Sequence, residues 1–503
     1  MVSRVPDRGQ PRRTFDWYVI AYQTACDRVR LKFLSDHERS QSMSLQEPPL
    51  PPPQTAPAHE SGKRFGLHDG VFQAVTQGSG EQYLSAFALL MHATPLHLSL
   101  LSALPQLLGT GAQLLSVHVA HWFSQRTTQV RWGIVGQSLA WIPILALPLL
   151  FPEWAPWLVV AGAALYFSSA HFAAPSWNSL ITDLLEANER GAYFARRSQL
   201  MAIASFAALC LGGILLSVFE QQQRPLIGFA VLFVTAGIFR SLSVRSLAQV
   251  TDRPVQHDEP AHQNIVAFLQ IGTSKDFRRF LVFSGLMHVA VLISGPFFVI
   301  YLLQDLHLPY WEYGTWLAAA IIGQFVTFPG WGRFSDRFGN KALLTFTGFL
   351  VSFLPMLYLV SSAWLFLITL NFFGGVVWAG LSLGLSNYVF DAVRPADRAK
   401  GVAVSSTVNA TGWAIGTLTG SWLISTVPGS IEFGALSLHP ASNLPFIFFM
   451  SGVLRLAISI ALLSTFREPR QVEHRPPSRL FCELPLIEPL SRWTIQRLKE
   501  SGR

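Results

Sequence analysis

Residues 342–390 read ALLTFTGFLVSFLPMLYLVSSAWLFLITLNFFGGVVWAGLSLGLSNYVF, with no Asp, Glu, Lys or Arg. A helix that spans a lipid bilayer needs about 20 apolar residues, so this stretch can form two spans joined by a short turn. Residues 82–125 are free of charge over a similar length and predict the same arrangement. The chain is therefore predicted to cross a membrane several times.

The composition of the whole chain supports this interpretation. Half of the 503 residues are hydrophobic and only 13% are charged, whereas roughly 25% of the residues in soluble domains are charged. Further charge-free stretches bring the number of predicted spans to twelve. The predicted fold class is an all-α membrane protein of two pseudo-symmetric six-helix bundles. The helices are expected near 70–93, 97–122, 132–152, 156–183, 192–219, 225–244, 279–303, 312–332, 342–361, 363–390, 400–427 and 443–466.

The positions of the basic residues predict the orientation of these helices. With both termini in the cytoplasm, only Arg224 lies on the opposite side and only Arg455 lies deep inside a span. This asymmetry follows the positive-inside rule. The net charge of +8 is spread over the cytoplasmic loops, which argues against nucleic-acid binding. Arg455 could pair with a neighbouring helix or meet lipid headgroups.

Outside the two bundles, the composition suggests tails and a linker. Residues 1–68 are basic and rich in proline, and we expect a mostly disordered cytoplasmic extension that starts at Met1 or Met43. The predicted domain boundaries are 1–68 for this extension, 69–244 for the first bundle, 245–277 for a cytoplasmic linker, 278–466 for the second bundle and 467–503 for a cytoplasmic tail.

The sequence suggests neither a cofactor nor an enzyme. Cys26, Cys210 and Cys482 lie far apart and have no metal or redox spacing. The sequence contains no phosphate-binding loop motif, so ATP-driven transport is not supported. A credible set of nucleophile or metal-ligand residues for intramembrane catalysis is also missing.

An internal repeat relates the two halves. An offset of 208 residues maps Asp183 onto Asp391 and Arg190 onto Arg398. The same offset maps the small residues Ala204, Ala208 and Gly212 onto Gly412, Gly416 and Gly420. Such small-xxx-small stripes let helices approach closely in lipid. Two parallel six-helix repeats are typical of transporters that bind their substrate near the midplane of the membrane.

Residues 332–341 read GRFSDRFGNK and follow the eighth predicted helix. This loop resembles the G-x-x-x-D-R-x-G-[RN]-[RK] signature of the major facilitator superfamily, and the resemblance covers roughly 69–466. It implies a rocker-switch transporter with helices 1, 4, 7 and 10 around a central cavity. The loop after the fourth helix resembles uncharacterised bacterial members, which implies a bacterial inner membrane. The implied gating residues are Gly332, Asp336, Arg337, Gly339, Lys341, Asp183, Arg190, Asp391 and Arg398.

The chemistry of this loop predicts a latch. Gly332 permits tight helix contact, and Asp336 can sit at the N-terminus of the eleventh helix near Gly401, where the helix dipole favours an anion. Arg337 can pair with a neighbouring carboxylate. A plain solvated salt bridge is the alternative. The first-half copy has His121, Gln125 and Thr128 at the signature positions, so only the second half is expected to keep the latch.

Polar residues inside spans are costly, and Glu81 is the most informative of them. It shares one helix face with Gln73, Gln77 and Ser85, a polar stripe expected to look into the cavity. Burial favours the neutral form of a carboxyl group, so Glu81 is a candidate proton carrier. A structural glutamate paired with a neighbouring helix is the alternative.

Two histidines extend the list of proton-coupling candidates. His288 falls at the repeat position of Gln77, and His171 lies within the fourth predicted helix. Imidazole titrates near neutral pH, although a histidine in a span can also be plain hydrogen-bonded packing. The further cavity candidates are Trp177, Asn178, Asn371, Trp378 and Ser382, whose aromatic and amide groups suit an uncharged or amphiphilic substrate.

These features predict a secondary transporter that moves a small organic solute by alternating access. We expect a monomeric symporter or antiporter in the bilayer, with a small-molecule substrate and protons as its partners. A transport-inactive membrane sensor or assembly factor with the same fold is the alternative, favoured by the degenerate first-half loop and the long cytoplasmic ends.

Overall fold

The computed structural model describes residues 56–185, 189–247, 250, 273–427, 431–433, 436–438, 442–472 and 484. The chain divides into two compact units, Met1–Ala56 and Pro57–Arg503, and the description below concerns the second. Most of the predicted N-terminal extension, of the linker 245–277 and of the tail 467–503 lies outside the described residues.

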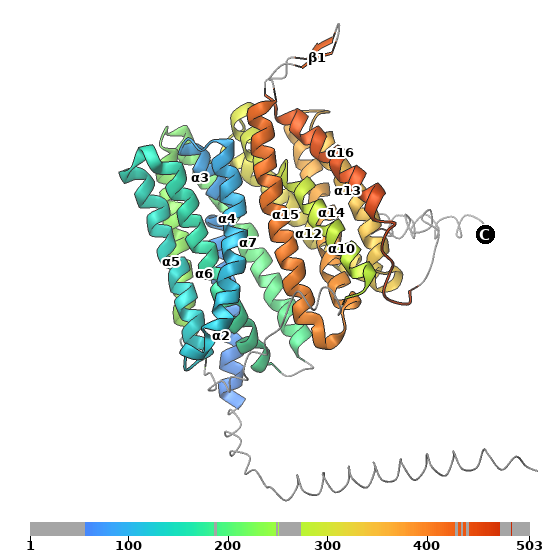
Figure 1. The fold of residues 1–503 in the computed structure, drawn as a ribbon. Coiled ribbons are helices and arrows are strands. Elements are labelled where there is room, and N and C mark those ends of the chain that lie inside the picture. Colours follow the sequence, from blue (N-terminus) through green and yellow to red (C-terminus); the bar gives the residue numbers. More distant parts are fainter. Residues whose placement is uncertain are drawn as a thin grey trace, which may run out of the picture. The chain divides into compact units, whose positions relative to one another are not determined.

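The second unit is almost entirely helical (Figure 1). Its first half contains α2 (Ala56–Ser79), η1 (Glu81–Tyr83), α3 (Leu84–Leu90), α4 (Pro95–His118), η2 (Ala120–Trp122), α5 (Arg126–Leu150), η3 (Pro152–Trp154), α6 (Ala155–Asp183), α7 (Arg190–Gln221) and α8 (Pro225–Leu247). Its second half contains α10 (Lys275–Leu292), η5 (Gly295–Phe297), α11 (Phe298–Ile300), η6 (Tyr301–Asp305), α12 (Tyr310–Phe338), α13 (Asn340–Leu357), α14 (Trp364–Ala392), η7 (Pro395–Asp397), α15 (Arg398–Thr426), the antiparallel strands β1 (Ile431–Phe433) and β2 (Leu436–Leu438), and α16 (Leu444–Leu462).

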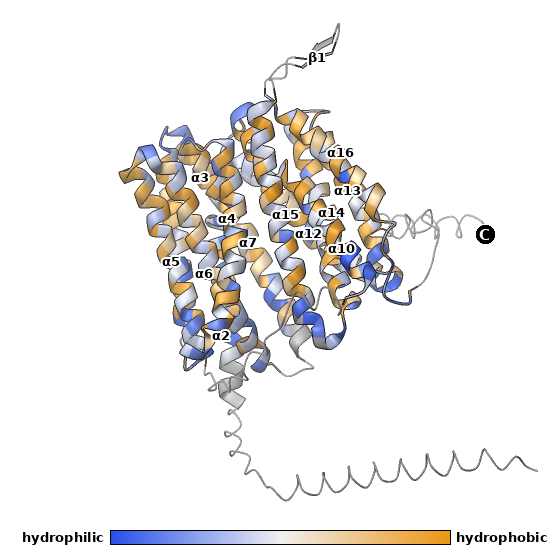
Figure 2. Cartoon of the chain, viewed as in Figure 1, coloured by the Kyte–Doolittle hydropathy of each residue, from blue (hydrophilic) through white to orange (hydrophobic). Residues whose placement is uncertain are grey.

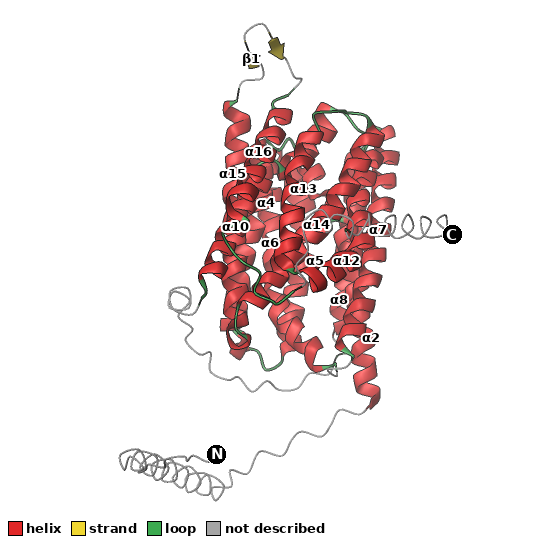
Figure 3. Ribbon diagram, turned by 90° about the vertical axis from the view of Figure 1, so that its right-hand side faces the viewer, coloured by secondary structure: helices red, strands yellow, loops and turns green. Residues whose placement is uncertain are grey.

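Each predicted span overlaps a helical segment. Within the described residues, nine segments are long and apolar enough to cross a membrane. The α2–α3 segment, α12 and α15 do not meet that standard, so the number of twelve spans stays a prediction. The helices run side by side with the β1–β2 hairpin at one end (Figure 3). We call this the hairpin end and the other, where the loops around 183–190, 333–341 and 391–398 lie, the motif end.

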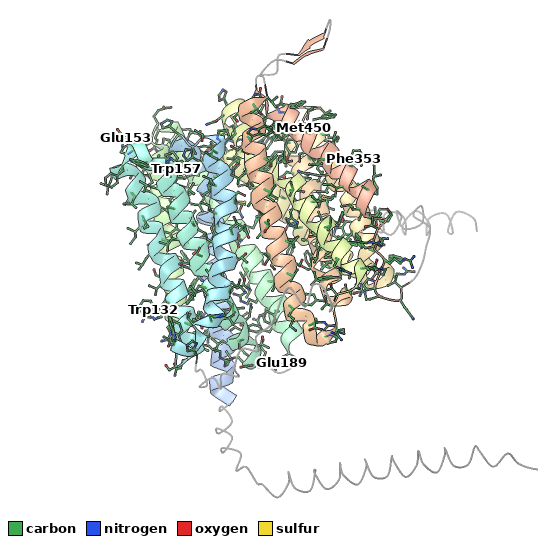
Figure 4. The ribbon with its side chains drawn as sticks, in the orientation of Figure 1. Trp132, Glu153, Trp157, Glu189, Phe353 and Met450 are labelled. Atoms are coloured by element: carbon green, nitrogen blue, oxygen red, sulfur yellow. The ribbon has the colours of Figure 1, made fainter. Side chains whose placement is uncertain are left out.

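The outer surface of the helices is apolar. Figure 2 shows hydrophobic residues along the helices and hydrophilic residues towards the helix ends. Trp132, Phe353 and Met450 are 63%, 47% and 38% exposed and point outward in Figure 4. An apolar surface this extensive is not stable in water, and it fits a multi-pass membrane protein.

Small residues bring corresponding helix pairs of the two halves together. A Cβ at Gly412 would lie 2.5 Å from the carbonyl oxygen of Gly285, and one at Gly416 would clash with the carbonyl of Val289, so α15 packs directly on α10. In the first half, a Cβ at Gly78 of α2 would clash with the backbone of α7. The predicted glycine stripe of the eleventh helix therefore serves close backbone packing.

The first and seventh predicted helices are interrupted, whereas the sequence predicted continuous helices over 70–93 and 279–303. The helix α2 also begins earlier than expected, and it ends at Ser79, before the short turn η1. A Cβ at Gly80 would clash with the ring of Trp141, so glycine lets this ring pack against the break. In the second half, α10 ends before Gly295 and Pro296, and proline lacks the N–H that would continue the helix.

The two halves touch at the hairpin end. Ser99 of α4 donates a hydrogen bond to the carbonyl of Thr417 at 2.8 Å, and Trp413 of α15 donates to the Ser102 hydroxyl at 2.7 Å. The amide of Tyr310 donates to Glu220, which joins α12 to α7. Every ion pair between two described residues stays within one half. The described hydrogen bonds between the halves therefore join α4 to α15 and α7 to α12.

The glycine packing gives a first prediction. Gly416→Val should destabilise the protein by about 1–3 kcal/mol through overpacking against α10. Gly111→Val is the matched control, because a Cβ there meets nothing within 4 Å and the change in helix propensity is the same. Thermal unfolding in detergent measures both variants, and equal losses would show that α15 does not depend on this contact.

Candidate functional site

A cavity of about 500 Å³ lies between the two halves. This volume is within the range of small-molecule sites. Its lining includes the polar or charged residues Glu81, Ser85, Ser102, Asn371 and Arg455 and the aromatic residues Phe167, Phe298, Trp316, Tyr358, Trp378 and Trp413. Both interrupted helices contribute to it, as expected where irregular backbone lines a cavity rather than faces lipid.

Glu81 occupies the break in the first helix. The Tyr166 hydroxyl of α6 donates a hydrogen bond to Glu81 Oε1 at 2.5 Å. Tyr166 is fully buried, and its ring lies 5.0 Å from that of Trp141. Within the described part of the chain, Glu81 has no other hydrogen-bond partner, so its second carboxylate oxygen is available to a ligand, a water molecule or a proton.

A second polar pocket of about 210 Å³ lies within the first half. Asp69 of α2 forms ion pairs with Arg240 at 3.4 Å and with Arg197 at 3.6 Å. Trp177 donates to Asp69 at 3.0 Å, and the Arg197 guanidinium lies 4.2 Å from the centre of the Trp177 ring. Arg240 also donates twice to Gln137 Oε1. This buried network ties α2, α5, α6, α7 and α8 into one body.

The predicted substrate residues separate into two places. Glu81, Asn371 and Trp378 line the central cavity. Gln73, Trp177 and Asn178 line the first-half pocket instead. Neither pocket is lined by Gln77 or Ser382.

The two histidines are not brought to the central cavity. The ring of His171 lies against Gly109 of α4. His288 Nδ1 lies 2.8 Å from the carbonyl oxygen of Ser284 in its own helix. Packing and local hydrogen bonding therefore account for both side chains, and their role in proton coupling stays a prediction.

The second-half loop is held by the segment that follows α16. Gly339 has a φ of +89°, a conformation that favours glycine, and a Cβ there would lie 2.5 Å from the Glu468 carboxylate. The same carboxylate accepts the Lys341 amide at 2.7 Å. Asp391 accepts from Asn340 at 2.6 Å and pairs with Arg470 at 3.0 Å. These contacts fix the loop to its own half.

Asp336, the residue expected to latch the halves, does not contact the N-terminus of α15 through a described hydrogen bond or ion pair. Asp336 is exposed and has no hydrogen-bond or ion-pair partner among the residues that the structure describes, so it makes no bond to α15 near Gly401. A Cβ at Gly332 would meet nothing within 4 Å. The Arg337 guanidinium lies 5.0 Å from the ring centre of Phe338, and Arg398 donates to the Phe390 carbonyl.

The first-half loop is held by an ion pair within its own half. Arg126 Nη1 donates to Asp183 at 2.5 Å and to the Ser179 hydroxyl at 2.8 Å. Asp183 thus pairs with Arg126, which occupies the position in the first-half loop that corresponds to Arg337 in the second half. The side chain of Arg190 lies outside the described residues.

Sequence reasoning missed several residues of these sites. The loop count placed Arg240 in the cytoplasm, but it is only 4% exposed and lies within α8. Asp69 and Tyr166 also went unnoticed. The helix breaks did leave a signal, since Gly80 and the Gly295-Pro296 pair both interrupt the first helix of their half, and such interruptions in corresponding helices point to a transporter site.

Comparisons with known proteins agree with this architecture. Residues 280–498 match the model of a family described as Major Facilitator Superfamily. No curated protein matches the chain in sequence. A mutant of the nucleoside transporter NupG has a similar structure, with a TM-score of 0.65 and 13% identity over 80% of this chain and 100% of that chain.

Two further solved structures are similar over nearly their full length. A bacterial homologue of the iron transporter ferroportin, in an inward-facing state, has a TM-score of 0.60 at 14% identity, over 82% of this chain and 99% of that one. A D-xylose–proton symporter has a TM-score of 0.60 at 13% identity over the same shares. The chain is thus a multi-pass membrane protein with a two-bundle fold. The family model matches residues 280–498, which lie in the second half of the chain, and the solved structures show the same fold.

The buried network gives the second prediction. Asp69→Asn should destabilise the protein by about 3–5 kcal/mol, because it leaves two buried arginines without a counter-charge. Asp183→Asn is the control, since this side chain is 62% exposed and its pair should contribute at most about 1 kcal/mol. Thermal unfolding compares the two, and an Asp69→Asn protein as stable as the control would refute the structural role of the network.

Proposed function

We propose that the chain is a proton-coupled secondary transporter of a small organic solute. In this proposal it crosses a bacterial inner membrane twelve times as a monomer, with the motif end in the cytoplasm. The observation that carries the proposal is the cavity of about 500 Å³ between the halves, which residues of both halves line. Such a cavity suits alternating access, whereas an enzyme would need a set of catalytic groups that the site does not offer.

The position of the hydrogen bonds between the halves supports a rocking mechanism. Hydrogen bonds from α4 to α15 and between α7 and α12 hold the hairpin end together in this conformation. Closure of the motif end would bring the Asp336 loop towards the N-terminus of α15, where the dipole favours an anion. Asp336 would then latch the cytoplasmic side while the hairpin end opens.

Glu81 is the proposed proton carrier. It lines the cavity and lies where helix geometry is already interrupted. Its single hydrogen bond to Tyr166 leaves one carboxylate oxygen for a proton. One of the similar structures is described as a D-xylose–proton symporter, which supports proton coupling on this fold but does not indicate the same substrate.

The proton-coupling proposal predicts the behaviour of Glu81→Gln. Proteoliposomes loaded with a pH-sensitive dye should acidify or alkalinise when one solute of a panel (uridine, D-xylose or phenylacetate) is added to the wild-type protein. Glu81→Gln should abolish this proton movement, because an amide cannot carry a proton between the two sides. Glu153→Gln is the control, since Glu153 lies at the hairpin end (Figure 4). Solute flux unaffected by a pH gradient would remove the coupling.

The latch proposal predicts a change in accessibility. Asp336→Asn should increase the labelling rate of Ser85→Cys by an impermeant maleimide from the cytoplasmic side by about two- to fivefold, the factor expected for one helix-dipole contact. The native cysteines are replaced first. Glu153→Gln is the control, because Glu153 lies at the hairpin end, away from the loop of Asp336 (Figure 4). Identical labelling in both variants would contradict a latch at Asp336.

A further inference from the structure

Arg455 places a positive charge in the central cavity that the proposed function does not explain. This residue lies in the middle of α16, is 5% exposed and lines the cavity. Its guanidinium donates to the Ser451 hydroxyl at 3.1 Å, to the Ser294 hydroxyl at 2.8 Å and to the carbonyls of Val351 and Val291 at 3.0 and 3.2 Å. These bonds come from α10, α13, α16 and the start of the helix break. They satisfy four of its five N–H groups.

None of these partners carries a charge. Arginine stays protonated in proteins, so hydrogen bonds to neutral groups orient the guanidinium but leave its positive charge uncompensated. A buried charge is normally paired, because its desolvation is costly. Among the described residues, no carboxylate lies within ion-pair distance of Arg455. Glu81 lines the same cavity, but no ion pair joins the two.

The first half provides the comparison. Arg240 lies in α8, the sixth helix of its half, and points at the first and third helices, as Arg455 does from α16. Arg240 is 4% exposed, and it meets the Asp69 carboxylate at 3.4 Å. The two halves therefore bury equivalent arginines, one with a counter-ion in the protein and one without. Arg455, the arginine without a counter-ion, is the one that lines the central cavity.

We propose that this cavity binds a small amphiphilic organic anion whose carboxylate pairs with Arg455. The guanidinium keeps one N–H free for a carboxylate oxygen, and its uncompensated charge strengthens that hydrogen bond. Trp378 and Trp413 provide flat apolar walls for the body of the ligand. Only one positive charge is left uncompensated, so a monocarboxylate fits better than a doubly charged phosphate ester. The inference rests on the proposed function, because it names the substrate class of the same cavity.

The test is binding to the purified full-length protein in detergent, which needs no transport. Thermal unfolding is followed with benzoate, phenylacetate and indole-3-acetate, each beside its primary amide at equal ionic strength, and with phenyl phosphate as the phosphate arm. The wild-type protein should be stabilised saturably by a carboxylate and not by its amide. Arg455→Gln should raise the Kd at least about tenfold, and Arg455→Lys should weaken binding less.

A second pair of variants covers the case in which Arg455→Gln does not fold. Ser294→Asp places a carboxylate beside the guanidinium, and Ser294→Asn places a neutral group of the same size there. Ser294→Asp should unfold at a higher temperature than Ser294→Asn without ligand and should lose the response to carboxylates, because the counter-ion is now internal. Ser294→Asn should keep the response.

Several results would overturn the inference. They are equal stabilisation by amides and carboxylates, stabilisation by phenyl phosphate alone, no response to any carboxylate, or an unchanged response in Ser294→Asp. The proposed function can fail separately. Carboxylate binding without flux in proteoliposomes would refute the transporter and leave the anion site standing, whereas proton-coupled flux of uridine or xylose without carboxylate binding would do the reverse.

Discussion

Polar groups that enter a bilayer must find their partners inside the protein, because lipid offers none. The structure meets this constraint first through its backbones. Glycines at Gly78, Gly412 and Gly416 let helices pack directly against one another, so that little space is left for unsatisfied polar groups. The same constraint explains why the helix breaks at Gly80 and Gly295 face the interior. Interrupted backbone is tolerated only where protein or water can satisfy it, and this is the place where the cavity forms.

The constraint is met differently for charges in the two halves. Arg240 and Asp69 neutralise each other within a network that also includes Arg197 and Gln137. That network links five helices of the first half to one another. Arg455 has its hydrogen bonds but lacks its counter-charge. A positive charge without a carboxylate partner in a shared cavity can bind an anion there. The first half makes the difference visible, because its buried Arg240 does have a carboxylate partner in Asp69.

Each span predicted from the sequence overlaps a helical segment, because runs without charge indicate a lipid environment. Glu81 was found for the same reason, since a carboxylate in such a run needs an explanation. Asp69 and Arg240 were missed because they lie near the predicted ends of helices, where charged residues are ordinary. Whether they face each other depends on how α2 and α8 pack. Tyr166 gave no signal, because an aromatic residue in a span is common and only its contact with Glu81 gives it a role.

The positions of Glu81 and Arg455 bear on how binding could drive the rocking of the halves. Tyr166 ties Glu81 to the first half, and bonds to α10 and α13 tie Arg455 to the second. A rigid-body movement of one half against the other must therefore change the distance between the two charges. A ligand shifts a conformational equilibrium only by as much as its affinity differs between the states. A solute or proton that interacts with both residues should bind the two states with different affinities, because the two residues are held by different bodies.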